Sequence, residues 1–139
     1  MKKYKIGYTQ GTYDLFHVGH LNLLNNAKKQ CEYLIVGVNS DELVKNYKNK
    51  NTIINQNERA LIVSNIKAVD KVYITNTLDK TEILKQIKFD AIFIGSDWKN
   101  DDRWKQTQID MAKKGIDVVF LPHTDGISTT IITQKYLKK

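Results

Sequence analysis

Short apolar runs rich in β-branched residues alternate along the chain with stretches in which apolar residues recur at helical spacing. Apolar runs of this length predict buried strands. The five predicted strands cover residues 4–8, 33–38, 71–74, 91–94 and 118–121. Helical spacing predicts the helices between them, around Leu21, Leu24 and Ala27; Ala60, Leu61, Ser64 and Ile66; Ile83, Leu84 and Ile87; and Ile109 and Ala112. A last helix is predicted over residues 128–137.

This alternation predicts an α/β fold, because strands joined by helical crossovers form a parallel sheet that is covered on both faces. We expect a single Rossmann-like domain over residues 1–139, with a five-stranded parallel sheet flanked by helices. Residues 46–57 are polar and rich in Lys and Asn, and are expected to form a mobile loop. In such sheets ligands bind at the carboxyl ends of the strands. Residues 11–20, 95–98 and 123–130, which follow predicted strands, are therefore the candidate site.

The composition is that of a globular protein with a packed core, since 41% of the residues are hydrophobic and 27% are charged. The single cysteine, Cys31, excludes an intrachain disulfide and is expected to be a small buried hydrophobe. The sequence has neither a signal segment nor an uninterrupted run of about 18 apolar residues. We expect a cytoplasmic protein with no membrane partner.

The net charge of +7 and the pI of about 9.4 suit a partner that carries phosphate. Most of the cations are lysines scattered among asparagines, and only Arg59, Arg103 and Trp104 could read or stack on bases. Because no nucleic-acid-binding module is visible, we expect a solvated lysine surface and no nucleic-acid partner. The same field favours a small phosphorylated ligand.

The first candidate stretch combines a tight turn with a helix start. Gly11 and Thr12 permit the turn, and His17 and His20 flank Gly19 where the helix is expected to begin. Unbonded N–H groups and a partial positive charge make a helix N-terminus attractive to phosphate. Each imidazole can donate a hydrogen bond to a phosphoryl oxygen, and Gly19 lets the ligand approach the backbone. The alternative is that the histidines only cap or line the helix.

The second candidate stretch has three consecutive hydroxyl residues after Ile127, namely Ser128, Thr129 and Thr130. A helix that begins here could meet an anion with its hydroxyl and N–H groups. Simple capping would account for one hydroxyl only, so phosphate binding is favoured.

Both stretches resemble motifs of one family. The run GTYDLFHVGHLNLL at residues 11–24 is similar to the HxGH core of the cytidylyltransferase family, within a nucleotidyltransferase superfamily that also includes adenylyltransferases. Residues 124–130, TDGISTT, resemble the family's RTEGIST motif. The motifs occur in the expected order, and the resemblance spans essentially the whole chain.

The resemblance implies a reaction in which an oxygen of a phosphorylated alcohol attacks the α-phosphorus of CTP and releases pyrophosphate. The compact length favours glycerol 3-phosphate as the alcohol, and the product would be a precursor of a cell-envelope polymer. Mg²⁺ is expected to bind with the triphosphate, and a homodimer is expected. The alternatives are an adenylyltransferase that acts on a sugar phosphate or a cofactor precursor, and a non-catalytic domain that binds nucleotide or nucleic acid.

The resemblance also implies roles for individual residues. The catalytic residues would be His17, His20, Lys48, Lys50 and Arg59. The nucleotide would be bound by Gly11, Thr12, Tyr13, Gly19, Asp97, His123, Thr124, Gly126, Ile127, Ser128 and Thr129. The phosphorylated alcohol would contact Lys48, Arg59 and Trp98, and no protein residue is expected to ligate the metal.

Several of these assignments have alternatives. Lys48 and Lys50 match the family's K-x-K loop only if one residue is inserted before them, and Lys45 competes with them. Trp98, in a run that resembles GDDW, suits packing better than direct contact. Asp14 would orient either a neighbouring backbone or a metal-bound water, or it would simply form a turn.

Two positions depart from the family pattern. His123 stands where relatives usually have arginine, so a titratable imidazole replaces a planar guanidinium that is permanently charged. Lys67 stands where relatives often carry arginine. Both changes weaken the glycerol 3-phosphate assignment more than they weaken the fold or the reaction class.

Overall fold

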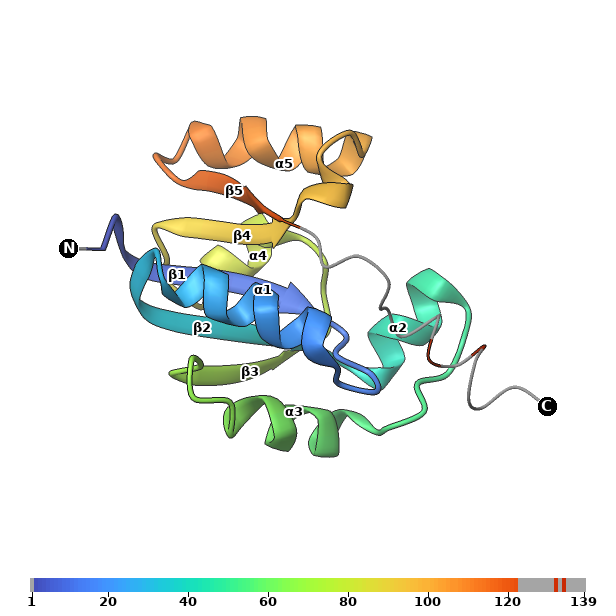
Figure 1. Cartoon of the computed structure of the whole chain (residues 1–139). Helices are drawn as coiled ribbons and strands as arrows, with labels where there is room; N and C mark the ends of the chain where they lie inside the picture. Colours follow the sequence, from blue (N-terminus) through green and yellow to red (C-terminus); the bar gives the residue numbers. More distant parts are fainter. Residues whose placement is uncertain (1, 123–131, 133, 135–139) are drawn as a thin grey trace.

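A five-stranded parallel sheet forms the centre of the molecule in the computed structural model, which describes residues 2–122, 132 and 134 (Figure 1). The strands are ordered β3-β2-β1-β4-β5. Their bounds are β1 (Tyr4–Gly11), β2 (Cys31–Asn39), β3 (Lys71–Thr75), β4 (Ala91–Gly95) and β5 (Asp117–Leu121). The predicted α/β fold with a five-stranded parallel sheet is confirmed, and each predicted strand lies within an observed one.

Helices cover both faces of the sheet (Figure 1). Their bounds are α1 (Val18–Lys28), α2 (Asp41–Lys48), α3 (Gln56–Ser64), α4 (Lys80–Leu84), the short 3₁₀ helix η1 (Ser96–Trp98) and α5 (Asp102–Ala112). The chain proceeds from β1 to β2 to β3 in one direction, and then returns to β4 on the other side of β1. The connections after β1 and β4 therefore diverge to opposite faces, which opens a crevice at the carboxyl ends of these strands.

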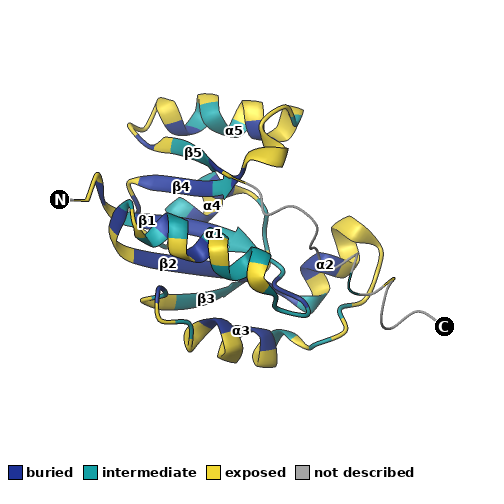
Figure 2. Cartoon of the chain, in the orientation of Figure 1, coloured by how far each residue is buried: buried dark blue, intermediate teal, exposed yellow. Residues whose placement is uncertain are grey.

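Two hydrophobic clusters, one on each face, hold the layers together. Leu24 of α1 and Val63 of α3 belong to one cluster with Phe93 of the sheet. Ile83 of α4 and Met111 of α5 belong to the other. Figure 2 shows that β2 and β4 are buried over most of their length, as the apolar runs predicted for strands covered on both sides.

The helix α2 is missing from the sequence prediction, and it shortens the predicted loop at residues 46–57. Its first turn is capped by Ser40, whose Oγ accepts a hydrogen bond from the backbone N of Leu43 at 3.0 Å. Only two of its residues, Leu43 and Val44, are buried, so its apolar pattern is too short to be recognised. Because α2 ends at Lys48 and α3 begins at Gln56, the loop extent was wrong at both ends. The helix predicted over 128–137 lies outside the described residues except for 132 and 134, and stays a prediction.

Candidate active site

His17 and His20 are joined at the N-terminus of α1 by a reciprocal cap. The backbone N of Gly19 donates to Nδ1 of His17 at 3.0 Å, and the backbone N of His17 donates to Nδ1 of His20 at 3.2 Å. The two rings are stacked, with their centroids 3.9 Å apart. A backbone N–H can only donate, so both Nδ1 atoms must be unprotonated. Each neutral ring therefore carries its proton on Nε2, which makes Nε2–H the ring's donor.

Both imidazoles are held neutral by their surroundings. Burial, and secondarily the neighbouring His17, lowers the pKa of His20 to about 3. Burial also lowers the pKa of His17. The His20 ring packs against Tyr13 and Phe16, with centroids 5.3 and 5.2 Å away. Tyr13 adopts a left-handed backbone conformation with φ of 57°, which turns the chain sharply between β1 and α1. The cap and the turn thus prepare two neutral hydrogen-bond donors at the positive end of a helix.

A cleft of about 400 Å³ opens at the carboxyl ends of the strands, where the crevice was expected. Ten of the predicted site residues line it: Gly11, Thr12, Tyr13, His17, Gly19, His20, Lys48, Lys50, Asp97 and Trp98. The cleft volume suits a small-molecule ligand. The structure therefore brings together residues that lie as far apart in the sequence as Gly11 and Trp98, while their individual roles stay predictions.

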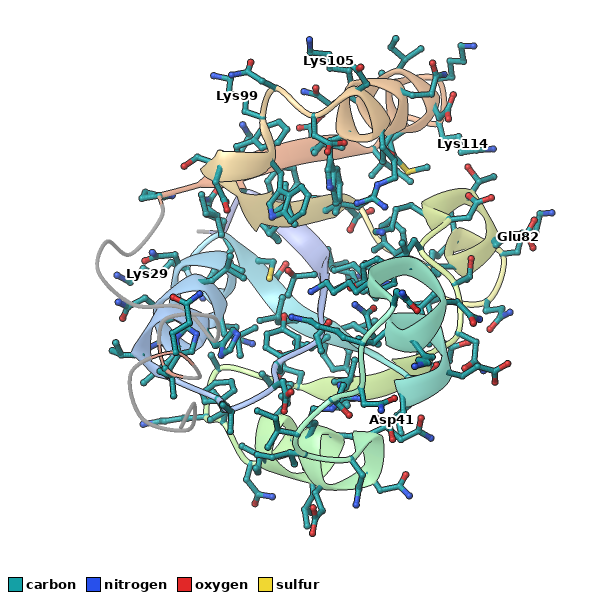
Figure 3. The ribbon with its side chains drawn as sticks, turned by 90° about the vertical axis from the view of Figure 1, so that its right-hand side faces the viewer. Lys29, Asp41, Glu82, Lys99, Lys105 and Lys114 are labelled. Carbon is teal, nitrogen blue, oxygen red and sulfur yellow. The ribbon has the colours of Figure 1, made fainter. Side chains whose placement is uncertain are left out.

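Arg59 is the predicted site residue that the structure keeps out of the cleft. Its side chain is fully buried, with 0% exposed. Nε donates to the carbonyl oxygen of Ile54 at 2.8 Å, and Nη1 donates to the carbonyl oxygens of Thr12 at 2.5 Å and Asn39 at 2.8 Å. The fourth hydrogen bond, from Nη2 to Oδ1 of Asp41 at 2.7 Å, is also an ion pair. Asp41 is labelled in Figure 3.

The predicted contact of Arg59 with substrate or phosphate is therefore corrected. Four of its five N–H groups donate to protein acceptors, so only one N–H group of the guanidinium remains for a ligand. Instead, it ties the turn after β1, the end of β2 and the start of α2 to the loop before α3.

Asp14 fastens the same loop from the other side. Its carboxylate accepts hydrogen bonds from the backbone N atoms of Ile53 at 2.7 Å and Ile54 at 2.9 Å. Of the alternatives for Asp14, the orientation of a neighbouring backbone is the one that the structure shows. The loop that follows Lys48 and Lys50 is thus anchored at its far end.

Among the candidate lysines, Lys48 and Lys50 line the cleft and Lys45 does not. Lys48 is the last residue of α2, and Asn49 caps the helix in a left-handed conformation with φ of 53°. Both lysines are exposed, so they can move towards a bound anion. The structure favours this pair over Lys45.

Trp98 lies at the rim of the cleft in η1, with 40% of its surface exposed. The packing role that the sequence favoured for Trp98 and its contact with the phosphorylated alcohol both stay predictions. Asp97, its neighbour, is exposed and lines the same rim. A Cβ at position 95 would come within 2.6 Å of Oδ1 of Asp97, so a larger residue than Gly95 would require this carboxylate to move.

Two cations in the cleft were not proposed as site residues from the sequence. Lys80, at the start of α4, is only 7% exposed, and its Nζ donates to the carbonyl oxygen of Leu78 at 2.8 Å. The same ammonium lies 5.1 Å from the centre of the Trp104 ring. Burial is the main cause that lowers the pKa of Lys80 to about 8. The second cation, Arg103 of α5, is exposed.

A hydrogen-bonded polar network, also missed, forms part of the cleft wall. Nε2 of Gln10 donates to Oδ1 of Asn39 at 2.8 Å and to the carbonyl oxygen of Thr77 at 3.0 Å. Nδ2 of Asn39 in turn contacts the hydroxyls of Thr12 and Tyr47 at 3.2 Å each. Thr12 was predicted, but no sequence signal identifies Gln10, Asn39 or Tyr47, because their partners come from separate elements.

The second predicted motif lies outside the described residues. This holds for His123, Thr124, Gly126, Ile127, Ser128 and Thr129. Their predicted nucleotide contacts stay predictions. Pro122, the last described residue before the motif, lines the cleft.

Comparison with known proteins gives consistent matches. Residues 8–135 match the family model described as cytidylyltransferase-like. The glycerol-3-phosphate cytidylyltransferase of Bacillus spizizenii is 38% identical over 125 residues, which are 89% of this chain and 91% of that protein. The glycerol-3-phosphate cytidylyltransferase of Staphylococcus aureus is 33% identical and is matched over 94% of both chains.

A solved structure agrees with the fold. The lipopolysaccharide core biosynthesis protein of Thermoplasma volcanium superimposes with a TM-score of 0.73 at 28% identity. The match covers 87% of this chain and 97% of that one. In the described residues no helix is long and apolar enough to cross a membrane.

Proposed function

Because the chain belongs to the cytidylyltransferase-like family, we propose that it is a nucleotidyltransferase that transfers a cytidylyl group from CTP to glycerol 3-phosphate. The observation that carries this proposal is the capped pair His17 and His20, whose neutral rings line a cleft that also contains four cationic side chains. The products are CDP-glycerol and pyrophosphate. The relatives in Bacillus and Staphylococcus support CTP and glycerol 3-phosphate as the substrates.

The chemistry is an in-line displacement at phosphorus. A phosphate oxygen of glycerol 3-phosphate forms a bond to the α-phosphorus of CTP, and the bond from that phosphorus to the bridging oxygen of pyrophosphate breaks. Such reactions are accelerated by positioning and by neutralising the charge on phosphoryl oxygens. The Nε2–H groups of His17 and His20 donate to these oxygens without having to gain or lose a proton. Lys48 and Lys50 add positive charge from the end of α2.

Lys80 and Arg103 are suited to hold the phosphate of the acceptor. The ammonium of Lys80 makes one described hydrogen bond, so it has N–H donors left for a phosphate oxygen. An anion beside this buried ammonium would offset its desolvation. The same two cations repel a cationic acceptor such as phosphocholine, and the ammonium of Lys80 already lies over the Trp104 ring that a cationic group would need. The geometry therefore favours a polyol phosphate.

Mg²⁺ is proposed to accompany the triphosphate. The described residues contain no group of three His, Cys, Asp or Glu side chains that could hold a metal ion. In the cleft, the carboxylate of Asp14 accepts hydrogen bonds from two backbone N–H groups. Mg²⁺ prefers phosphate oxygens and water to an all-protein cage, so it would bind to the triphosphate and offset part of its charge.

We also propose that the enzyme acts in the cytoplasm, where CTP is found, and that it forms a homodimer. Four large hydrophobic side chains are exposed on α1, α3 and the loop before α3: Val18, Ile53, Leu61 and Ile62. Leu61, with 64% of its surface exposed, is the most accessible of them. Light scattering would show a dimer in the parent protein and a monomer in Leu61→Glu if this surface makes the contact.

The test of the reaction is a matrix of pyrophosphate release. Each of the four nucleoside triphosphates is combined with glycerol 3-phosphate, phosphocholine, phosphoethanolamine and several sugar phosphates. We expect release only when CTP and glycerol 3-phosphate are both present, and its loss when His17 and His20 are both changed to alanine. Lys105→Ala, outside the cleft, is the control. Release with ATP and a sugar phosphate would instead identify an adenylyltransferase, and full activity in the double variant would contradict the mechanism.

A further inference from the structure

Positive charge is concentrated at the end of the sheet that lies opposite the cleft. All five strands begin at this end, on the left in Figure 1, together with the ends of α1, α3, α4 and α5 that lead into them. The four connections into β2, β3, β4 and β5 each carry exposed lysine. We call this surface the amino-end face and define it by Lys29, Lys67, Lys71, Lys88, Lys113 and Lys114.

None of these six lysines makes an ion pair within the part of the chain that the structure describes. Four carboxylates lie near these lysines, and three of them, Asp70, Asp90 and Asp117, take part in hydrogen bonds of the fold, while Glu32 is exposed. Asp70 binds Lys28 at 2.5 Å and the backbone N of Leu34 at 2.8 Å. Asp90 accepts from the backbone N of Ile6 at 2.9 Å, and Asp117 accepts from the hydroxyl of Tyr4 at 2.7 Å. The lysines are thus left without a structural role, and they face solvent.

The substrates do not explain this charge. β1 and β2 contain eight and nine residues, so the amino-end face lies roughly 25 Å from the cleft at about 3.3 Å per residue. The Debye length at physiological ionic strength is only about 8 Å. The amino-end face is therefore screened from a nucleotide in the cleft. The cleft end itself is acidic as well as basic, since Asp97, Asp101 and Asp102 follow β4.

The chemistry of the amino-end face favours a partner with diffuse negative charge. It is built from lysines alone, because the two arginines of the chain, Arg59 and Arg103, lie at the other end. Lysine carries a point charge on a flexible side chain. It lacks the planar guanidinium of arginine, which donates paired hydrogen bonds to a single phosphate or base edge. A layer of anionic headgroups needs only such point charges, and each lysine near it contributes about 1 kcal/mol.

We propose that the amino-end face docks the enzyme on an anionic membrane surface. The docking is peripheral and electrostatic. In this orientation the cleft, at the opposite end of the strands, faces away from the lipid and stays open to nucleotide from solution. The proposal does not depend on which acceptor the enzyme uses, so it can fail while the proposed function stands.

The test is co-sedimentation of the full chain with vesicles of phosphatidylcholine, alone or with about one third phosphatidylglycerol. The double variant Lys88→Glu with Lys114→Glu is compared with Lys99→Glu with Lys105→Glu, which has the same change of charge at the end of η1 and on α5, nearer the cleft. Lys99, Lys105 and Lys114 are labelled in Figure 3. We expect binding only to the anionic vesicles, weaker binding when salt is raised, and at least a tenfold loss in the first variant. In the second variant binding should change less than about twofold.

Pyrophosphate release in solution and the thermal midpoint, measured in both double variants, separate docking from catalysis and from folding. Both should match those of the parent protein. Absence of binding to anionic vesicles, or equal losses in the two variants, would overturn the proposal. Binding of double-stranded DNA but not of vesicles would overturn it in favour of a nucleic-acid partner.

Discussion

The two ends of the sheet use positive charge in opposite ways. At the carboxyl end, Arg59 is fully buried with four protein acceptors, and Lys80 is 7% exposed beside Trp104. At the amino end, lysines such as Lys88 and Lys114 are exposed and make no described ion pair. A charge removed from water interacts strongly over a few ångströms, whereas an exposed charge is screened and interacts weakly. Buried cations such as Arg59 and Lys80 therefore suit the positioning of individual groups. Exposed lysines suit a general attraction to a negatively charged surface.

The largest effect is expected from Arg59→Met, which removes the buried charge and keeps much of its volume. Asp41 and three backbone carbonyl groups lose their donor, so the free energy of unfolding should fall by about 3–5 kcal/mol. Urea denaturation measures the change. Arg103→Met is the matched control, because this arginine is exposed and should cost less than about 0.5 kcal/mol. Similar losses in the two variants would remove the contrast between buried and exposed cations.

His17→Asn separates capping from catalysis. Asparagine is a good N-cap, so the free energy of unfolding should change by less than about 0.5 kcal/mol. The variant lacks the Nε2–H donor, however, and kcat/KM for pyrophosphate release should fall about 10²–10³-fold. Denaturation and steady-state kinetics are measured on the same preparation. If activity survives in this variant, the histidine serves only to cap α1.

The pH dependence of acceptor use tests Lys80. Its pKa of about 8 means that the ammonium, the form that binds phosphate, is lost from the free enzyme as the pH rises above that value. We expect kcat/KM for glycerol 3-phosphate to decline above about pH 8, while KM for CTP changes little. In Lys80→Arg this decline should vanish, since arginine stays charged. A decline at the same pH in this variant would show that another group titrates.

The same pKa has a consequence for stability. The unfolded chain, where the pKa of lysine is close to its ordinary value of 10.5, binds the proton of Lys80 more tightly than the folded protein does. Between about pH 8 and 10.5 this group therefore makes the free energy of unfolding rise with pH. Lys80→Met should remove that rise, and denaturation at several pH values compares the two. Parallel profiles would contradict the lowered pKa.

The smallest effects are expected at the amino-end face. Lys113→Ala with Lys114→Ala should change the free energy of unfolding by less than about 0.5 kcal/mol and kcat/KM by less than about twofold. The residues are exposed, lie outside the cleft and have no ion-pair partner among the described residues. Thermal denaturation and pyrophosphate release measure both quantities. A larger loss of activity would show that the two ends of the sheet are coupled.

Sequence patterns predicted the regular parts of the fold and the local parts of the site. The strands follow from apolar runs that are buried on both faces, and the helix start at His17 and His20 uses contacts within four residues. The helix α2 escaped prediction because only Leu43 and Val44 mark its buried side. The stretches 11–20 and 95–98 were located from the ends of predicted strands, and the resemblance to a family added individual roles and Lys48 and Lys50. The structure shows residues of both stretches lining one cavity with the two lysines.

The sequence by itself determined the order of strands and helices, the carboxyl-end location of the cleft and the presence of an HxGH pair, because these depend on periodicity and on neighbouring residues. Only the tertiary structure decided what Arg59 and Lys80 do. Arg59 donates to Thr12, 47 positions away, and Lys80 is desolvated beside Trp104 of another helix. The same is true of the amino-end face, since its lysines are scattered along the chain until parallel strands bring them to one end. Burial and partners depend on contacts between distant segments, and a linear pattern does not contain them.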